Sequence, residues 1–220
     1  MAGLSVTTAP STTPITLAEA KAFLRIDTSD DDALINTLIG AARDFAEEYT
    51  GRTLINTTYK LSLDGFVEDD IPIKEGLYQA PYMNFYKRYI PLARPPLVSV
   101  THIKTFTDDD TESTFASSKY YVDTQRNPGR VVLRDGETWP TSLRVANAVE
   151  ITYVGGYGSA TSDVPQSIKV GMREHITYLY EHRGEVEPNL ANFPILAKQL
   201  YQPYRVLSFS NNPFSNSGGY

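Results

Sequence analysis

The amino-acid sequence predicts an α+β fold: a small helical bundle with an antiparallel β module inserted between its first and last helices. Apolar residues recur at helical spacing near both ends of the chain, within 16–50 and 164–201. Between 59 and 154, short stretches instead alternate apolar and polar residues, and turn-forming clusters such as Asn127-Pro128-Gly129 separate them. The order of helices, strands and helices again indicates a β module within a helical chain.

The composition is that of a folded protein with a limited range of chemistry. The 220 residues are enough for one large domain or two small ones, and 41% of them are hydrophobic. The chain has no cysteine, which excludes disulfides, iron–sulfur clusters, thiolate zinc sites and thiol nucleophiles. It also lacks an uncharged apolar run near the roughly 20 residues of a membrane span, and its start lacks a signal-peptide pattern. We therefore expect a soluble, intracellular-type protein that contacts no membrane.

The first elements are an arm and a pair of helices. Residues 1–14 are rich in Ser, Thr and Pro without periodicity, which predicts a flexible arm. Thr16 with Glu19 forms the pattern of a capping box at the start of a first helix. Ser29 with Asp32 repeats this signal for a second helix, which ends near Thr50 at a left-handed Gly51. The predicted apolar stripe of the second helix consists of Leu34, Leu38, Ala41, Phe45 and Tyr49, widened by Ile35, Ile39 and Ala42. We expect the two helices to pack as an antiparallel pair.

The middle and end of the chain predict strands and two further helices. The strand candidates are 59–63, 97–106, 119–123, 129–134 and 148–154, and they suit an antiparallel sheet, a small barrel or a sandwich. The helical period then returns from Val164-Pro165 to Gly184 and in a short helix over 194–201. The predicted organisation is a helical connector domain over 15–56 and 159–206, a β module over 57–158 with an extended loop 67–93, and a C-terminal tail 207–220.

Motifs for catalysis, cofactors and metals are absent from the sequence pattern. His175 and His182 lie two turns apart on one helix, about 10 Å along its axis, so they cannot share one metal ion. We interpret the repeated Glu174-His175 and Glu181-His182 pairs as a polar helix face. Gly155-Gly156-Tyr157-Gly158 lacks the residues of a phosphate loop and predicts a tight turn after the last strand. The sequence therefore predicts no catalytic, cofactor-binding or metal-binding residue.

An aromatic cluster near the middle of the chain is a candidate contact surface. Tyr78, Tyr82, Phe85, Tyr86 and Tyr89 occur close together beside Lys87 and Arg88. Such a segment can pack over the β module, anchor another protein, or stack on single-stranded nucleic acid, although the net charge of −6 weakens the last reading. The candidate subunit or partner contacts are Tyr82, Phe85, Tyr86, Arg88 and Arg94.

Charge is unevenly distributed along the chain. Arg43 is the single base among many acids between Asp27 and Glu48, whereas 81–104 contains bases and no acid. This segregation can arise from solvated faces by chance. It also suits a molecule that meets copies of itself through unlike surfaces, as head-to-tail rings do.

Several short motifs follow one another in a fixed order along the chain. They include Leu17-Ala18-Glu19-Ala20-Lys21, Phe23-Leu24-Arg25-Ile26-Asp27, Tyr49-Thr50-Gly51-Arg52, Leu63-Asp64-Gly65-Phe66, Arg94-Pro95-Pro96-Leu97, Pro128-Gly129-Arg130-Val131, Gly155-Gly156-Tyr157-Gly158, Tyr180-Glu181-His182-Arg183 and Pro203-Tyr204-Arg205-Val206. This order resembles the phage head–tail connector proteins, the adaptor or head-completion proteins of long-tailed phages and gene transfer agents. Two departures from the family pattern are the long insertion 67–93 and a polar middle of the C-terminal helix at Arg173, Glu174 and His175.

The resemblance implies a structural virion protein rather than an enzyme, without cofactors. Twelve copies would form a ring between the portal protein of the head and the stopper or tail terminator, around the channel for the genomic DNA. Such a protein is made in the cytoplasm of the bacterial host and resides in the virion neck. The alternative is a tail-side completion protein, either a stopper or a tail terminator.

Within this resemblance, two groups of residues are candidate contacts. We expect the acids Asp30, Asp31, Asp32, Glu47 and Glu48 to face either the lumen, where they would repel DNA, or the basic 81–104 stretch of a neighbouring copy. We expect the C-terminal segment to become ordered on the portal protein through Tyr204, Arg205, Phe209, Phe214 and Tyr220.

Overall fold

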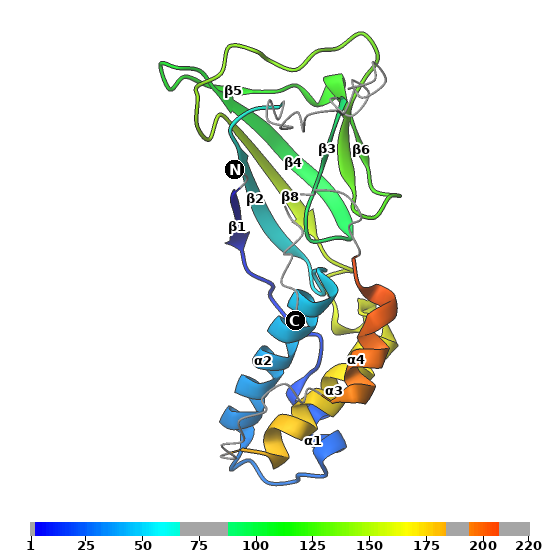
Figure 1. Cartoon of the computed structure of the whole chain (residues 1–220). Helices are drawn as coiled ribbons and strands as arrows, with labels where there is room; N and C mark the ends of the chain where they lie inside the picture. Colours follow the sequence, from blue (N-terminus) through cyan, green and yellow to red (C-terminus); the bar gives the residue numbers. More distant parts are fainter. Residues whose placement is uncertain (1–2, 67–87, 184–193, 207–220) are drawn as a thin grey trace, which may run out of the picture. The chain divides into compact units, whose positions relative to one another are not determined.

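The α+β prediction is confirmed by the computed structural model, which describes residues 3–66, 88–183 and 194–206. The described residues contain four α-helices and two antiparallel sheets (Figure 1). They divide into two compact units, each with its own hydrophobic core. The β unit comprises the described parts of 3–9 and 57–155, and the helical unit comprises those of 10–56 and 156–207. Within the described ranges, none of the helices has the length and apolar character that a membrane crossing demands.

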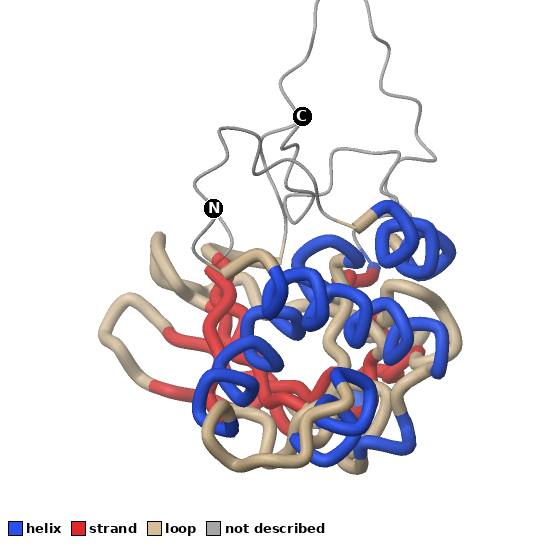
Figure 2. Tube along the Cα trace, turned by 90° about the horizontal axis from the view of Figure 1, so that it is seen from below, coloured by secondary structure: helices blue, strands red, loops and turns tan. Residues whose placement is uncertain are grey.

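The helical unit is built from helices α1 (Leu17–Leu24), α2 (Asp32–Thr50), α3 (Gln166–Glu181) and α4 (Ile195–Tyr201). Figure 2 shows these helices, in blue, packed side by side. The capping box at α1 is confirmed: the Glu19 amide donates to Thr16 Oγ1 at 3.1 Å, and the Thr16 amide donates to Glu19 Oε2 at 2.9 Å. Gly51 ends α2 in the left-handed conformation, with φ of 69°, as predicted. A buried Lys169 Nζ lies 2.7 Å from Glu19 Oε1 and so connects α3 to α1.

For α2 the predicted start is wrong and the predicted stripe is right in part. The helix begins at Asp32 rather than after Ser29, and its N-cap Asp31 makes no capping hydrogen bond with its side chain. The Asp31 carboxylate instead accepts a hydrogen bond from the Tyr180 hydroxyl and lies 3.6 Å from Arg183 Nη1, both at the end of α3. The predicted stripe is confirmed where it was widened, at Ile35, Ile39 and Ala42. Its central row is half-buried or exposed instead: Leu34, Leu38, Ala41, Phe45 and Tyr49. Because apolar residues occupy both rows, only the position of α3 decides that the buried row is Ile35, Ile39, Ala42, Ala46 and Thr50.

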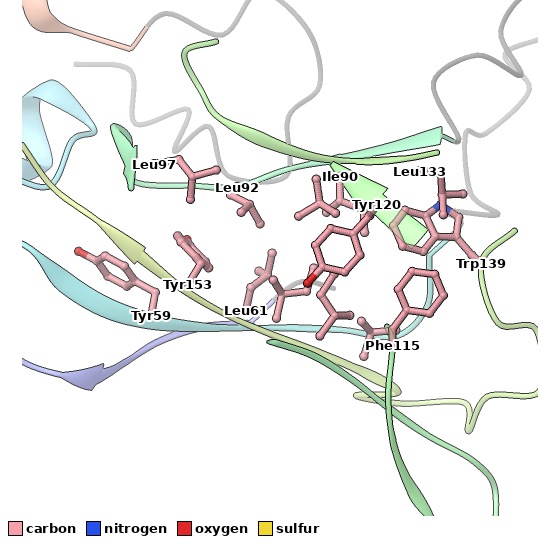
Figure 3. Close-up of a cluster of buried hydrophobic side chains, with 14 of the residues drawn as sticks. Tyr59, Leu61, Ile90, Leu92, Leu97, Phe115, Tyr120, Leu133, Trp139 and Tyr153 are labelled. Atoms are coloured by element: carbon pink, nitrogen blue, oxygen red, sulfur yellow. The ribbon is translucent and has the colours of Figure 1, made fainter. Parts of the chain in front are cut away.

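The β unit consists of two sheets that share one core. The larger sheet has the order β1-β2-β8-β4-β5, and the smaller has the order β3-β7-β6. Side chains from both sheets meet between them around Leu61, Tyr120 and Tyr153, and Trp139 lies at the edge of this core (Figure 3). The strands are β1 (Gly3–Thr8), β2 (Thr57–Leu63), β3 (Tyr89–Pro91), β4 (Leu97–Phe106), β5 (Glu112–Thr114), β6 (Tyr120–Asp123), β7 (Arg130–Leu133) and β8 (Val149–Gly155).

Strands β1, β3 and β5 were not expected from the sequence. Gly3–Thr8 lies within the predicted flexible arm but pairs antiparallel with β2, with Leu4 opposite Leu61 and Val6 opposite Tyr59. All six residues of β1 are exposed, so the strand has no buried–exposed alternation that a sequence pattern could reveal. Strands β3 and β5 have three residues each, which is too short for a period to be recognised. In all three cases backbone pairing with a neighbouring strand, rather than side-chain pattern, creates the element.

His175 contradicts the interpretation of a polar helix face. Its side chain is 7% exposed, and its ring lies edge-on against Phe45 with the ring centroids 5.0 Å apart. Burial lowers the pKa of His175 from 6.5 to about 4, because a charged imidazolium would lose its hydration there. The polar reading failed because a neutral histidine can occupy a core position among apolar neighbours such as Met172 and Ile176.

We expect the free energy of unfolding to decrease as the pH falls from 6.5 towards 4, owing to His175. In that range the unfolded chain protonates this residue while the folded chain does not, so protons favour the unfolded state. The pKa difference corresponds to a loss of about 3 kcal/mol. Urea unfolding at stepped pH values measures the effect, and His175→Leu should remove this part of the pH dependence. The same dependence in His175→Leu and in the parent protein would contradict the assignment.

Candidate assembly surfaces

The functional candidates among the described residues are side chains that a partner could contact. Within 3–66, 88–183 and 194–206, no group of three or more His, Cys, Asp or Glu side chains is arranged to hold a metal ion. The candidate contacts therefore have to be judged by exposure, charge and the partners that their side chains already have.

The five acids of the α2 region are not brought together. Asp32 and Glu48 are separated by about 24 Å along the helix axis at 1.5 Å per residue. Asp31 accepts from Tyr180, Asp32 lies 2.6 Å from Lys21 Nζ, and Glu47 Oε1 accepts from the Leu54 amide at 2.8 Å, so these acids are engaged within the unit. The side chains of Asp30 and Glu48 are exposed, one at each end of the helix.

The last described residues are hydrogen-bonded to the C-terminal end of α2 and the residues that follow it. The Arg52 guanidinium donates to the Tyr204 carbonyl, and the Val206 amide donates to the Thr50 carbonyl at 2.8 Å. The Arg205 guanidinium lies 5.4 Å from the centroid of the Tyr49 ring. The Tyr49 hydroxyl donates a hydrogen bond to Gln202 Oε1 at 2.6 Å. Tyr204 and Arg205 therefore lie on a well-anchored segment. Three other predicted portal contacts lie outside the described residues: Phe209, Phe214 and Tyr220.

Of the predicted subunit contacts, Arg88 and Arg94 lie at either side of β3 in the β unit. The Arg88 guanidinium donates to Asp135 Oδ1 at 3.2 Å and to the Arg134 carbonyl at 3.0 Å. Arg94 is half-buried in the loop before β4 and has a left-handed backbone with φ of 58°. The remaining three contacts, Tyr82, Phe85 and Tyr86, lie outside the described residues.

The outer face of the smaller sheet carries an alternation of tyrosines and arginines. Tyr89 and Tyr121 lie on either side of Val132 in the register of the three strands, so the three side chains form one row. The Arg130 guanidinium lies over the Tyr89 ring at 4.9 Å, and that of Arg134 lies over the Tyr121 ring at 3.7 Å. We call this surface the Tyr–Arg face. It combines two of the residue types that are enriched at the centres of protein interfaces.

The Tyr–Arg face is incompletely neutralised. Arg130 lies 2.9 Å from Asp123 Oδ2, and this hydrogen bond lowers the pKa of Asp123. Arg134 has no ion-pair partner among the described residues, and its buried Nε lacks a hydrogen-bond acceptor there. Tyr121, whose ring lies beneath it, is 53% exposed. A cation and an aromatic ring are therefore presented together to the surroundings.

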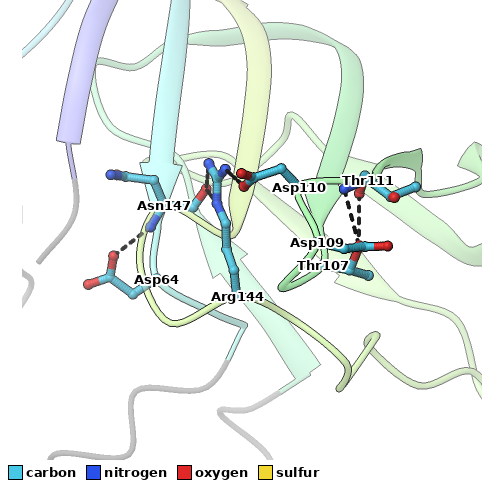
Figure 4. Close-up of polar contacts among 7 residues, drawn as sticks. All are labelled: Asp64, Thr107, Asp109, Asp110, Thr111, Arg144 and Asn147. Carbon is cyan, nitrogen blue, oxygen red and sulfur yellow. Dashed lines mark hydrogen bonds and ion pairs between the residues drawn. The ribbon is translucent and has the colours of Figure 1, made fainter.

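A second surface is the turn between β4 and β5, where Asp108, Asp109 and Asp110 are all exposed; we call it the acidic tip. Asp109 accepts hydrogen bonds from the Thr107 hydroxyl and from the Thr111 amide, the latter at 3.3 Å (Figure 4). These bonds lower the pKa of Asp109 and keep its carboxylate charged. The side chain of Asp108 has no partner among the described residues, so the tip presents net negative charge.

The acidic tip is held by the neighbouring loop. Arg144 Nη1 lies 2.9 Å from Asp110 Oδ1, and Arg144 Nη2 donates to the Asn147 carbonyl at 2.7 Å (Figure 4). The Asn147 amide in turn donates to Asp64 Oδ1 at 2.9 Å, which adds the end of β2 to the network. The tip is therefore positioned before any partner binds, which reduces the ordering cost of a contact.

Both surfaces were missed as functional candidates. The sequence predicts a turn at Asp108, Asp109 and Asp110 and a strand over 129–134, but neither pattern identifies a contact surface. The alternation of Arg130, Val132 and Arg134 is a signal of an exposed strand face. The pairing of these arginines with tyrosines on other strands depends on the register, which the sequence alone does not reveal.

Comparisons with known proteins agree with this fold. The whole fold is similar to a chain from the structure described as the neck of an empty GTA particle computed with C6 symmetry. The two chains have 20% identity and a TM-score of 0.71, and the match covers 96% of this chain and 98% of that chain. A chain from the virion of a native gene transfer agent particle gives 19% identity, a TM-score of 0.71, and coverage of 95% and 98%. A chain from the neck of a native GTA particle computed with C12 symmetry has 19% identity and a TM-score of 0.69, and the match covers 96% of this chain and 98% of that chain.

The sequence comparisons are more restricted in extent. A comparison with curated proteins finds no match. Residues 14–94, which span α1, α2, β2 and β3, match the family described as phage gp6-like head-tail connector protein. The resemblance of this chain to the phage head–tail connector proteins is thereby confirmed.

Proposed function

We propose that this chain is a structural head–tail connector, an adaptor subunit that assembles into a ring in the neck of a virion. The ring, of twelve copies, joins the portal protein of the head to the stopper or tail. It surrounds the channel through which genomic DNA passes without sequence-specific binding. The role is one of assembly without turnover or cofactor.

The family match over residues 14–94 carries the proposal. The likeness of the whole fold to chains from neck structures computed with C6 and C12 symmetry supports the proposal. A subunit of such a ring presents two different surfaces to its two neighbours. The exposed acids Asp30 and Glu48, together with the net charge of −6, suit a protein beside DNA that it does not grip.

The decisive experiment is cosedimentation of the purified protein with DNA-filled, tailless heads that carry a portal, followed by averaging of the occupied vertex. We expect a ring under the portal, and no binding to heads whose portal is already covered by a tail. Binding to isolated tails instead would identify a tail-side stopper or terminator. Binding to neither particle would contradict a connector role.

Deletion of residues 208–220 should abolish attachment to the portal while leaving the fold intact. The chain up to Val206 is secured to α2 by its own hydrogen bonds, so the deletion removes candidate contacts, including Phe209, Phe214 and Tyr220, without disturbing that anchor. Cosedimentation measures attachment, and the far-UV circular dichroism and unfolding midpoint control for folding. Undiminished attachment of the truncated chain would exclude the tail as the portal contact.

We also propose that the acids of the α2 region, Asp30, Asp31, Asp32, Glu47 and Glu48, face either the lumen or the basic segment of a neighbouring copy. Reversing the charges of Arg88 and Arg94 distinguishes the two arrangements. Weaker ring assembly with an altered salt dependence is expected if the basic segment is the partner. Unchanged assembly and salt dependence would leave the lumen as the location of the acids.

A further inference from the structure

We propose that the Tyr–Arg face of one copy binds the acidic tip of a neighbouring copy, and that this contact is repeated around the ring. The inference rests on the proposed function, because it names the partner of a surface that a ring subunit would use. The partner is a second copy of this chain, and the contact is between two unlike surfaces of the β unit.

Complementary charge is the first argument. The Tyr–Arg face has an arginine, Arg134, without an ion-pair partner among the described residues. The acidic tip has an exposed carboxylate at Asp108, without a partner in the described part of the chain, and a second charged one at Asp109. An aspartate that approaches Arg134 would form a charge-assisted hydrogen bond beside an aromatic ring, away from bulk water.

The position of the two surfaces is the second argument. Within the β unit, the β4–β5 end and strand β6 lie on opposite sides in Figure 1. A contact between opposite sides of identical units is heterologous, so every copy donates one surface and accepts with the other. Repetition of such a contact generates a closed ring when the rotation per copy divides the circle.

The chemistry of the Tyr–Arg face favours a protein over a nucleic acid. A surface for single-stranded DNA would need a continuous basic groove beside its aromatic rings. On this face Arg130 is already neutralised by Asp123, and the neighbouring Arg88 contacts Asp135. The protein as a whole carries a net charge of −6, which disfavours binding to phosphates.

Cross-linking provides a direct test, because the chain contains no cysteine of its own. Asp108→Cys and Tyr121→Cys would be introduced singly and together, at two exposed positions, and assembled on portal-bearing heads. A short bis-maleimide should convert the double variant into a ladder of covalent oligomers larger than dimers. Each single variant should remain monomeric, since one thiol per copy cannot bridge unlike surfaces.

Charge exchange tests the same contact independently. Arg134→Glu should raise the protein concentration needed for half-occupancy of the heads roughly tenfold, because two carboxylates would then face each other. Adding Asp108→Arg to the same chain should restore most of the affinity, since the pair is then present with its signs exchanged. Circular dichroism of both variants confirms that they are folded.

The outcomes separate this inference from the proposed function. Rings that form on heads but give no ladder, or that tolerate Arg134→Glu without a change in occupancy, would overturn the inference and leave the connector role in place. Failure of the unmodified protein to form rings on heads would instead refute the connector role. A cross-linked product with a different neck protein in place of the ladder would also overturn the inference.

Discussion

Replacing Tyr201 with alanine is expected to lower the free energy of unfolding by about 4 kcal/mol. Tyr201 is fully buried at the end of α4, and its ring fills the space left by the missing side chain of Gly171 on α3. A Cβ built on Gly171 would lie 2.7 Å from Tyr201 Cε1, so the two helices approach closely at this point. The alanine variant leaves a cavity between α3 and α4 that neither helix backbone can close easily.

The matched control for this prediction is Ile195→Ala on the same helix. Ile195 is 74% exposed, so its truncation should change the free energy of unfolding by less than about 0.5 kcal/mol. Urea unfolding followed by circular dichroism compares the two variants. Equal effects of Tyr201→Ala and Ile195→Ala would show that the ring does not support the packing of α4.

The second large effect is expected for Gly156→Ala, at roughly 3 kcal/mol of lost stability. Gly156 has φ of 146°, a conformation that L residues with side chains rarely adopt. A Cβ there would lie 2.6 Å from the Asn56 amide nitrogen and 2.7 Å from the Asn56 Cα, both backbone atoms. The two segments cannot separate freely, because the Asn56 amide donates to the Gly158 carbonyl at 2.9 Å.

Gly40→Ala provides the control with the opposite sign. Gly40 lies in the middle of α2, and a Cβ at this position meets nothing within 4 Å. Alanine there should raise the free energy of unfolding by about 0.5–1 kcal/mol, because it restricts the unfolded chain and favours the helix. Thermal unfolding of both variants measures the contrast. A Gly156→Ala protein as stable as the parent would mean that the turn can adopt another path.

Long elements with a clear period could be predicted from the sequence. The helix pair, the capping box of Thr16 and Glu19, the stop at Gly51 and the strand at Leu97–Phe106 all follow from local patterns. The Gly155-Gly156 turn was recognised as well, but not why the second glycine is required: its neighbour Asn56 is distant in the sequence. Elements without such a pattern were missed, as β1 shows, since its residues are all exposed and held by backbone pairing with β2.

For the candidate contact residues, too, the sequence reveals the residue types, whereas the fold decides which partners they have. The charge of each acid near α2 is evident from the sequence. However, Asp31 accepts a hydrogen bond from Tyr180 and Glu47 accepts one from the Leu54 amide. Only folding brings these partners close. The Tyr–Arg face likewise requires the register that places Arg134 over Tyr121.

From the sequence we could establish the α+β class, the order of the main helices and strands, the absence of cysteine chemistry and the resemblance to head–tail connectors. These properties depend on composition and on patterns between residues close together in the chain. The three-dimensional structure was needed to show which row of α2 is buried, that His175 belongs to the core, and which charged side chains stay exposed to a partner. Each of these depends on contacts between segments far apart in the sequence, where local periodicity carries no information.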